Sequence, residues 1–152
     1  VLAEHSPEYF EMERDSRYMI LISQVNEELR NELPENYHEK PLKEKLYYVR
    51  SSIPAITHLD FTARLQTVHQ DTNPRYWQLI DAFREETGCP IVVNTSFNVR
   101  GEPIVRTPYE AYRCFMRTNM DYLVMQDCFF DKGKQPEWPE EKDEWREEID
   151  LD

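Results

Sequence analysis

Residues 89–110 read CPIVVNTSFNVRGEPIVRTPYE. The apolar start of this stretch, residues 89–93, is typical of a strand that is buried on both faces. A polar loop, residues 94–103, follows, and Thr107-Pro108-Tyr109-Glu110 predicts a capping box at the start of a helix. In α/β proteins, anionic ligands bind where a strand ends and a helix begins. The sequence therefore indicates either a ligand loop or an ordinary connection whose Asn and Ser residues stabilise turns.

Helix and strand signals continue on both sides of this stretch. Before it, Asn73 and Pro74 predict the start of a helix that Gly88 ends, with Ile80 on its apolar face. After it, residues 122–125 form an apolar run that predicts a further strand. Alternating strands and helices with short connections predict an α/β fold, with a sheet that contains right-handed crossovers.

The first half of the chain carries weaker signals. Residues 6–10 predict a short helix, residues 18–22 a buried strand and residues 46–49 another short strand. Polar and apolar residues alternate over residues 64–68, which predicts a half-buried strand. Residues 26–45 are polar and contain two prolines, so we expect a mobile surface excursion there.

Charge restricts the classes of partner. The chain has 152 residues, enough for one domain with a real core, and a net charge of −12. Residues 131–152 alone carry ten acidic and four basic side chains. Such a chain repels a phosphate backbone, so nucleic-acid binding is disfavoured and a few arginines must provide any anion binding.

The sequence gives no sign of a membrane segment, a secretion signal or a metal site. It lacks an apolar run of the roughly 20 residues needed to cross a bilayer, and residues 1–5 have no basic or apolar signal region. Cys89, Cys114 and Cys128 do not have metal-ligand spacing. We therefore expect reduced, mostly buried thiols in a cytoplasmic protein without a structural metal.

Two segments carry a family resemblance. They are residues 58–68, HLDFTARLQTV, and residues 87–105, TGCPIVVNTSFNVRGEPIV. Both resemble the C-terminal domain of the NodU/CmcH-type O-carbamoyltransferases. The resemblance continues through Thr107-Pro108 to the strand at Tyr122, and residues 1–4 with residues 8–10 are similar to the start of that domain. Only residues 24–50 and the acidic tail fall outside the pattern.

The resemblance implies a fold and half of a reaction. The fold is YrdC-like, a twisted open α/β sheet with flanking helices over residues 1–131, before an acidic tail at residues 132–152. Carbamoyl phosphate and ATP, with Mg²⁺ held mainly by the nucleotide phosphates, would form carbamoyl adenylate on this domain. An N-terminal kinase-like domain, which this sequence does not contain, would then transfer the carbamoyl group to a hydroxyl of a small molecule. Because family members carry a Lys-x-Arg motif just upstream, we expect a fragment that is inactive alone.

Adenylate formation requires fixed positive charge and hydrogen-bond donors beside phosphate oxygens. Arg64 is the first candidate because the family's matching arginine belongs to the ligand site. Its alternative role is that of a surface arginine in a cross-strand pair. Ser96 is the second candidate, since its loop resembles the Thr-Ser-x-Asn signature of YrdC-like enzymes. No base lies near Ser96 in the sequence, so we do not expect a covalent mechanism.

Other polar residues are expected to complete the pocket. Gln66 should share a strand face with Arg64, because strand side chains alternate. Asn94 and Asn98 offer amides to a carbamoyl group or an adenine edge, although Asn98 suits turn stabilisation equally well.

Four further side chains have two alternatives each. Arg100 and Arg106 either contact phosphate or face solvent. His58 is also a candidate substrate or nucleotide contact. Together, His58 and Asp60 suggest metal or proton chemistry, or a histidine whose hydrogen bonds fix the bend before the strand.

A second function class, a non-catalytic domain-docking module, is compatible with the same sequence. Its candidate contacts are an apolar face and the tail, where Trp138, Trp145 and Ile149 are the large apolar residues. Pro139 is suited to starting a short acidic helix, which would either dock or remain solvated. RNA binding, suggested only by fold analogy, is disfavoured by the acidic balance.

Overall fold

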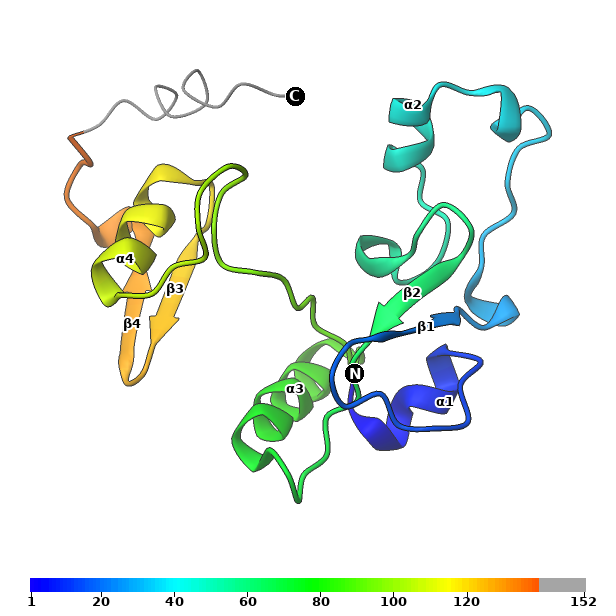
Figure 1. Ribbon diagram of the computed structural model, residues 1–152, viewed down its shortest axis with the longest axis horizontal. Helices are drawn as coiled ribbons and strands as arrows, with labels where there is room; N and C mark the ends of the chain where they lie inside the picture. Colours follow the sequence, from blue (N-terminus) through cyan, green and yellow to red (C-terminus); the bar gives the residue numbers. More distant parts are fainter. Residues whose placement is uncertain (140–152) are drawn as a thin grey trace. The chain divides into compact units, whose positions relative to one another are not determined.

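The computed structural model describes residues 1–139 and divides into two compact units, unit 1 (Val1–Val93) and unit 2, which begins at Asn94 (Figure 1). The helices are α1 (Ser6–Tyr9), α2 (Leu42–Tyr47), α3 (Pro74–Thr87) and α4 (Pro108–Arg117). The strands are β1 (Leu21–Gln24), β2 (Thr62–Leu65), β3 (Tyr122–Met125) and β4 (Cys128–Asp131). The mixture of helices and strands agrees with the predicted α/β class.

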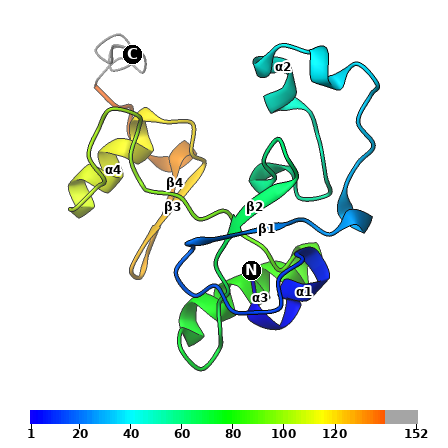
Figure 2. The same cartoon turned by 45° about the vertical axis from the view of Figure 1, so that its right-hand side comes forward.

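Unit 1 is built on an antiparallel ribbon of β1 and β2, in which Leu21 pairs with Leu65 and Gln24 pairs with Thr62. Figures 1 and 2 both show this ribbon between α2 on one side and α1 with α3 on the other. The inner face of β2 contributes buried residues to a core that also contains Val25, Phe10 and Ile91. Burial of this apolar surface is the main stabilising contribution of the ribbon.

Helix α3 has the ends that the sequence predicts. The side chain of Asn73 accepts a hydrogen bond from the Tyr76 N–H, Pro74 occupies the first turn, and Gly88 ends the helix with a left-handed φ of 77°. Ile80 is fully buried against Leu2 and Val68.

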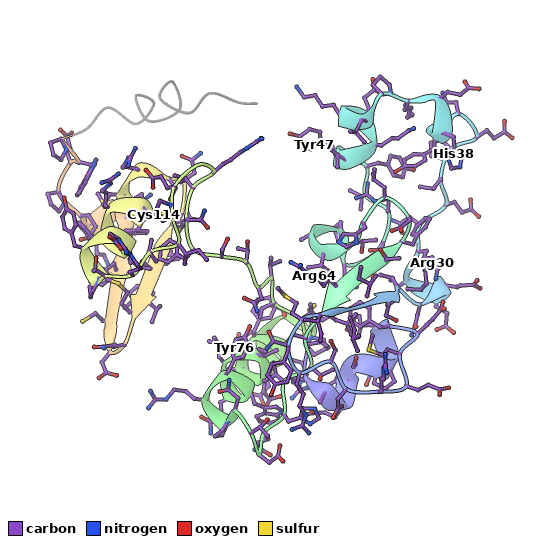
Figure 3. The ribbon with its side chains drawn as sticks, viewed as in Figure 1. Arg30, His38, Tyr47, Arg64, Tyr76 and Cys114 are labelled. Carbon is purple, nitrogen blue, oxygen red and sulfur yellow. The ribbon has the colours of Figure 1, made fainter. Side chains whose placement is uncertain are left out.

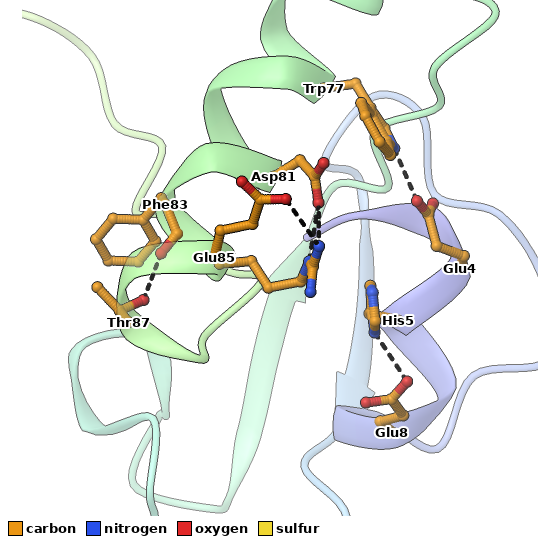
Figure 4. Close-up of polar contacts among 9 residues, drawn as sticks. Glu4, His5, Glu8, Trp77, Asp81, Phe83, Glu85 and Thr87 are labelled. Carbon is orange, nitrogen blue, oxygen red and sulfur yellow. Dashed lines mark hydrogen bonds and ion pairs between the residues drawn. The ribbon is translucent and has the colours of Figure 1, made fainter.

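Polar contacts also surround α3 (Figure 4). Trp77 Nε1 donates to Glu4 Oε1 at 2.8 Å, which ties α3 to the first residues of the chain. Arg84 pairs with Asp81 at 2.7 Å, one turn earlier on the same helix. These contacts are exposed or partly exposed, so we attribute the docking of α3 mainly to its apolar face.

Unit 2 consists of α4 and the hairpin of β3 and β4. The Thr107 hydroxyl accepts from the Glu110 N–H while the Glu110 carboxylate accepts from the Thr107 N–H, so the predicted capping box is present. Phe115 and Leu123 form the core between α4 and the hairpin, and Trp138 packs against them. Trp138 thus docks within unit 2, whereas Trp145 and Ile149 lie outside the described residues.

The hairpin was only half predicted. Its first strand, β3, was expected, but β4 was not. Gln126, in the two-residue turn, has a φ of 51°, a conformation more often adopted by Gly or Asn than by Gln. The usual hairpin signal is therefore missing from the sequence.

Several strand predictions were wrong. Residues 18–22 do not form a buried strand: Tyr18 is 81% exposed, Met19 has a φ of 53°, and β1 starts only at Leu21. Residues 42–47 are helical, so the strand expected at residues 46–49 is absent. Both errors follow from judging apolar residues locally, because only a pairing partner decides whether they become a strand.

Residues 89–93 are also not a strand. The Pro90 carbonyl accepts from the Leu2 N–H, but proline has no N–H for a ladder, and Val93 is exposed. Without this strand, the described residues contain two separate two-stranded antiparallel sheets. The expected single sheet with parallel crossovers is not among them.

The remaining segments are turns and short 3-10 helices. These helices are Ala3–His5, Glu27–Leu29, Tyr37–Glu39, Pro54–Ile56 and Lys132–Lys134. The predicted surface excursion, residues 26–45, is largely exposed around one buried side chain, Tyr37. The cysteines are all free: Cys114 is buried, as expected, but Cys89 is half-buried and Cys128 is exposed.

Candidate functional site

Arg64 projects from the exposed face of β2 (Figure 3). Its cross-strand neighbour is Ile22, which is 60% exposed and carries no charge. On the inner face, Ala63 and Leu65 are buried, so the strand fixes the direction of Arg64. Within residues 1–139, its guanidinium has no hydrogen bond or ion pair. The alternative of a cross-strand ion pair is therefore not found in the described part of the chain.

A network of short polar side chains shapes the turn before β2. His58 Nδ1 lies 2.9 Å from Thr62 Oγ1, and Asp60 Oδ1 accepts from the Thr62 hydroxyl at 2.7 Å and the Thr62 N–H at 3.1 Å. The Thr62 hydroxyl and N–H lower the pKa of Asp60 below its usual range, with a smaller contribution from His58. His58 thus makes the turn-fixing contacts of its second alternative.

The residue immediately before β2 has an unusual backbone. Phe61 has a φ of 63°, in the left-handed region that favours glycine. The guanidinium of Arg30 lies over its ring, 5.4 Å from the centroid, and the Phe61 carbonyl accepts from the Val25 N–H at 2.9 Å. Contacts from a separate segment therefore hold the bend that directs the chain into β2.

Arg50 is a structural residue that the sequence did not reveal. Its side chain is buried, and its Nε and Nη2 donate to the carbonyls of His58 at 3.0 Å and Thr57 at 2.9 Å. Its Nη1 also donates to the Lys45 carbonyl. Arg50 therefore holds together the segment that leads into β2. No local pattern predicts this, because backbone carbonyls leave no signature in the sequence.

Gln66 follows the end of β2. Its side-chain Nε2 donates to the Arg17 carbonyl at 2.9 Å, and it is half-buried, whereas Arg64 is exposed. Because β2 ends at Leu65, Gln66 does not share the expected strand face with Arg64. Its side chain instead contacts the segment before β1.

Unit 2 begins with residues 94–106, which contain the polar loop of residues 94–103. Asn94 and Ser96 are exposed, and within the described residues the Ser96 hydroxyl has no hydrogen bond. Asn98 instead donates from Nδ2 to the carbonyls of Val99 and Glu102, each at 3.0 Å. Asn98 therefore makes the contacts of a turn-stabilising residue, and the hydroxyl of Ser96 remains accessible.

The side chain of Glu102 anchors the second half of the polar loop to α4. Glu102 Oε1 accepts from Arg113 at 3.2 Å and from Arg117 at 3.0 Å. Sequence reasoning missed this anchor, although a signal exists: Arg113 and Arg117 are four residues apart on a predicted helix and must share a face.

The two predicted loop arginines differ in their surroundings. Arg100 is exposed and has no ion pair within the described residues. Arg106 is also exposed, with Nη2 at 3.9 Å from Glu110 Oε1. Arg106 and Arg113 line a small hollow of about 160 Å³ with Glu102 and Glu110, which balance their charge.

The predicted residues therefore form two groups. His58, Arg64 and Gln66 belong to unit 1, and Asn94, Ser96, Asn98, Arg100 and Arg106 belong to unit 2. Each group contains exposed donors: the guanidinium of Arg64 in the first, and the Ser96 hydroxyl with the Arg100 guanidinium in the second. Such donors bind phosphate or carboxylate oxygens and do not supply a general base.

A metal-binding cluster and a membrane-spanning helix are both absent from the described residues. Across residues 1–139, no three His, Cys, Asp or Glu side chains gather in a way that would hold a metal ion. The same residues contain no helix with the length and apolar character needed to span a membrane.

Comparison with known proteins identifies the group to which these features belong. The carbamoyltransferase C-terminus family matches residues 1–132. An uncharacterized protein of Synechocystis sp., sll1178, is 53% identical over the whole chain, which covers 25% of that protein's length. The nodulation protein NolO of Bradyrhizobium diazoefficiens is 45% identical over 98 residues, 62% of this chain and 18% of NolO.

An enzyme with a named reaction is also similar. The 3'-hydroxymethylcephem-O-carbamoyltransferase of Amycolatopsis lactamdurans is 34% identical over 93 residues, which cover 59% of this chain and 18% of that enzyme. The chain thus spans a quarter or less of the length of these three relatives.

Proposed function

The chain belongs to the carbamoyltransferase C-terminus family, and on this premise we propose that it is the activation domain of an ATP-dependent O-carbamoyltransferase. In this proposal the domain uses carbamoyl phosphate and ATP to form carbamoyl adenylate. The named reaction of the Amycolatopsis relative, carbamoyl transfer to a hydroxymethyl group, supports the transferase class.

The observation that carries the proposal is the accessible guanidinium of Arg64. An arginine without a partner among the described residues, on a strand that fixes its direction, is suited to a phosphate group because its N–H groups form two parallel hydrogen bonds. Buried or loop-anchoring arginines such as Arg50 and Arg117 already bind chain atoms. Arg64 is therefore the residue of unit 1 that we assign to phosphate or carbamoyl recognition.

Unit 2 supplies uncharged and charged donors of the same kind. Ser96 has an exposed hydroxyl that suits a phosphate or carbamoyl oxygen, and Arg100 and Arg106 are exposed guanidinium groups. Asn94 carries an amide that suits the carbamoyl group or the adenine edge. Gln66, in unit 1, carries a second amide, whose Nε2 donates to the Arg17 carbonyl. These residues fit a nucleotide whose Mg²⁺ is held by phosphates and water, since such an ion does not require an acidic cluster.

The proposed reaction balances with one water. Water cleaves carbamoyl phosphate into carbamate and phosphate. A carbamate oxygen then attacks the α-phosphorus of ATP, and the bond between that phosphorus and pyrophosphate breaks. The role of the chain's donors is to stabilise the negative charge that develops on these oxygens. We further propose that the domain is YrdC-like, works in the cytoplasm, and acts with a kinase-like domain that transfers the carbamoyl group to a small-molecule hydroxyl.

The role of Arg64 is tested by calorimetric titration of the chain with ATP and carbamoyl phosphate in the presence of Mg²⁺. We expect Arg64→Ala to weaken binding about tenfold or more, because it removes a charged hydrogen-bond donor. Arg14→Ala is the matched control, since Arg14 is an exposed arginine of unit 1 without a contact in the described residues. Equal affinity in wild type and Arg64→Ala would contradict the assignment of Arg64.

A chain that binds neither ligand requires the same titration on the polypeptide at its natural length. If that polypeptide also binds neither ligand and releases no pyrophosphate, the proposed activation function is wrong. If it binds both and the Arg64→Ala polypeptide does not, the function holds and the site needs the rest of the chain.

A second candidate function, domain docking without catalysis, is favoured by one observation. The outer face of the β3–β4 hairpin exposes Tyr122, Val124 and Phe129, and the rings of Tyr122 and Phe129 stack at 5.3 Å. An apolar patch of this kind suits a neighbouring domain of the same polypeptide. Phe129→Ser should weaken association under this hypothesis and leave ligand binding unchanged under the first.

A further inference from the structure

We infer that Glu102 is a positioning residue that anchors the polar loop to α4 and thereby orders Ser96. Its predicted effect on ligand binding rests on the proposed function. Its effect on the loop does not, because every contact involved lies within unit 2.

The anchor joins one carboxylate oxygen to two arginines of one helix face. Glu102 Oε1 lies 3.2 Å from Arg113 Nη2 and 3.0 Å from Arg117 Nη1. The Arg117 side chain is only 8% exposed and that of Glu102 is 30% exposed, so water weakens this contact less than an ordinary surface ion pair. Glu102 is therefore held on α4 more firmly than a solvated glutamate.

The backbone around Glu102 closes the loop. The Glu102 N–H donates to the Val99 carbonyl at 3.1 Å, and the Glu102 carbonyl accepts from Asn98 Nδ2 at 3.0 Å. Gly101 has a φ of 87°, which lets the chain reverse immediately before Glu102. The backbone of Glu102 therefore closes the loop, while its side chain binds α4.

The closed loop leads directly to Ser96. The Val105 N–H donates to the Phe97 carbonyl at 3.0 Å, which joins the two arms, and the Phe97 side chain packs in the core of unit 2. Ser96 precedes Phe97, and its own hydroxyl has no hydrogen bond among the described residues. The orientation of Ser96 therefore depends on the residues that follow it, 97–105. Glu102 holds these residues in place without contacting Ser96.

The test compares Glu102→Ala and Glu102→Gln with a matched control, Glu137→Gln. Glu137 is an exposed glutamate of unit 2 without a contact in the described residues, so its change removes the same charge. Two NMR readouts need no ligand: hydrogen exchange of the Val105 amide and backbone order at Ser96. Exchange of the Phe115 amide in α4 reports whether the unit is still folded.

In Glu102→Ala, we expect the Val105 amide to exchange about tenfold faster and Ser96 to become more mobile, with Phe115 unchanged. Glutamine keeps one acceptor oxygen, so its effect should be about threefold. Glu137→Gln should match the wild type. If Glu102→Ala does not fold, Arg113→Lys provides the same comparison from the helix side.

The outcomes separate this inference from the proposed function. Unchanged Val105 exchange and unchanged Ser96 order in Glu102→Ala would overturn the inference, whatever the ligand results. Increased Ser96 mobility with unchanged affinity for ATP and carbamoyl phosphate would overturn the link to binding. If the wild-type polypeptide at natural length binds neither ligand, the proposed function fails, and the NMR comparison still decides the role of Glu102.

Discussion

Two turns of this protein contain or precede residues that we predict to contact ligand. A buried guanidinium stabilises one turn, and a carboxylate stabilises the other. The turn of residues 50–62 leads into β2 and Arg64, and its main internal donor is the buried guanidinium of Arg50, which binds backbone carbonyls. The loop of residues 94–107 contains Ser96 and leads into α4, and its anchor is the carboxylate of Glu102, which binds arginines of the helix.

The arginines of the protein are of two kinds: framework arginines, which bind atoms of the chain, and accessible arginines, which have no such contact in the described part of the chain. Arg50, Arg113 and Arg117 have contacts with chain atoms, whereas the guanidinium of Arg64 has none within residues 1–139. A charge that already satisfies its hydrogen bonds has little to offer a ligand, because the existing contact must first break. Residue type alone therefore does not identify an anion site, and the pairing of each arginine does.

The largest expected stability difference is between the two arginines of unit 1. Arg50→Met leaves carbonyls without their charged donor in a buried segment, so we expect a loss of about 3 kcal/mol in the free energy of unfolding. Arg64→Met removes an exposed side chain without a partner among the described residues, so we expect a change within about 0.5 kcal/mol. Urea denaturation of both variants measures the difference. Similar losses in the two variants would show that the distinction between framework and accessible arginines is wrong for unit 1.

A smaller difference is expected between the hydroxyls that stabilise the two turns. Thr107→Ala removes the N-cap of α4 and should cost about 1 kcal/mol. Thr62→Val removes an exposed hydroxyl that bonds Asp60 and His58, and should cost about 0.5 kcal/mol, since water replaces these contacts more easily. Thermal unfolding of both variants ranks them. A larger loss from Thr62→Val would mean that the turn before β2, and not the cap of α4, depends more on its hydroxyl.

The smallest expected effect is on the acid side of the stability curve. The Thr62 hydroxyl and N–H lower the pKa of Asp60, and the Arg106 and Thr107 N–H groups lower the pKa of Glu110. Because both folded-state pKa values lie below the unfolded ones, each carboxylate stabilises the fold above its unfolded pKa. That contribution is lost as pH falls through the folded pKa.

Unfolding measured between about pH 5 and pH 2 tests this effect, since unfolded Asp and Glu titrate near 4. Wild type should lose stability slightly more steeply than Asp60→Asn or Glu110→Gln. Parallel curves for all three proteins would show that neither turn depends on its carboxylate.

The sequence by itself determined the features that depend on neighbouring residues. Asn73 and Gly88 define the two ends of α3 and Thr107 defines the start of α4, because a cap binds backbone groups only three or four residues away. The sequence also predicted Arg64 and Ser96 as ligand-contacting residues, from their place in the segments that resemble the family, and these assignments remain predictions.

Only the tertiary structure decided which apolar runs became strands and which charges remained accessible. Residues 18–22 and 89–93 have strand-like composition, but a strand needs a partner far away in the sequence, and Pro90 cannot donate to one. Likewise, the sequence does not show which of Arg50 and Arg64 is buried. One is buried among carbonyls and the other is exposed on a strand, because long-range packing sets the environment of a side chain and local sequence does not.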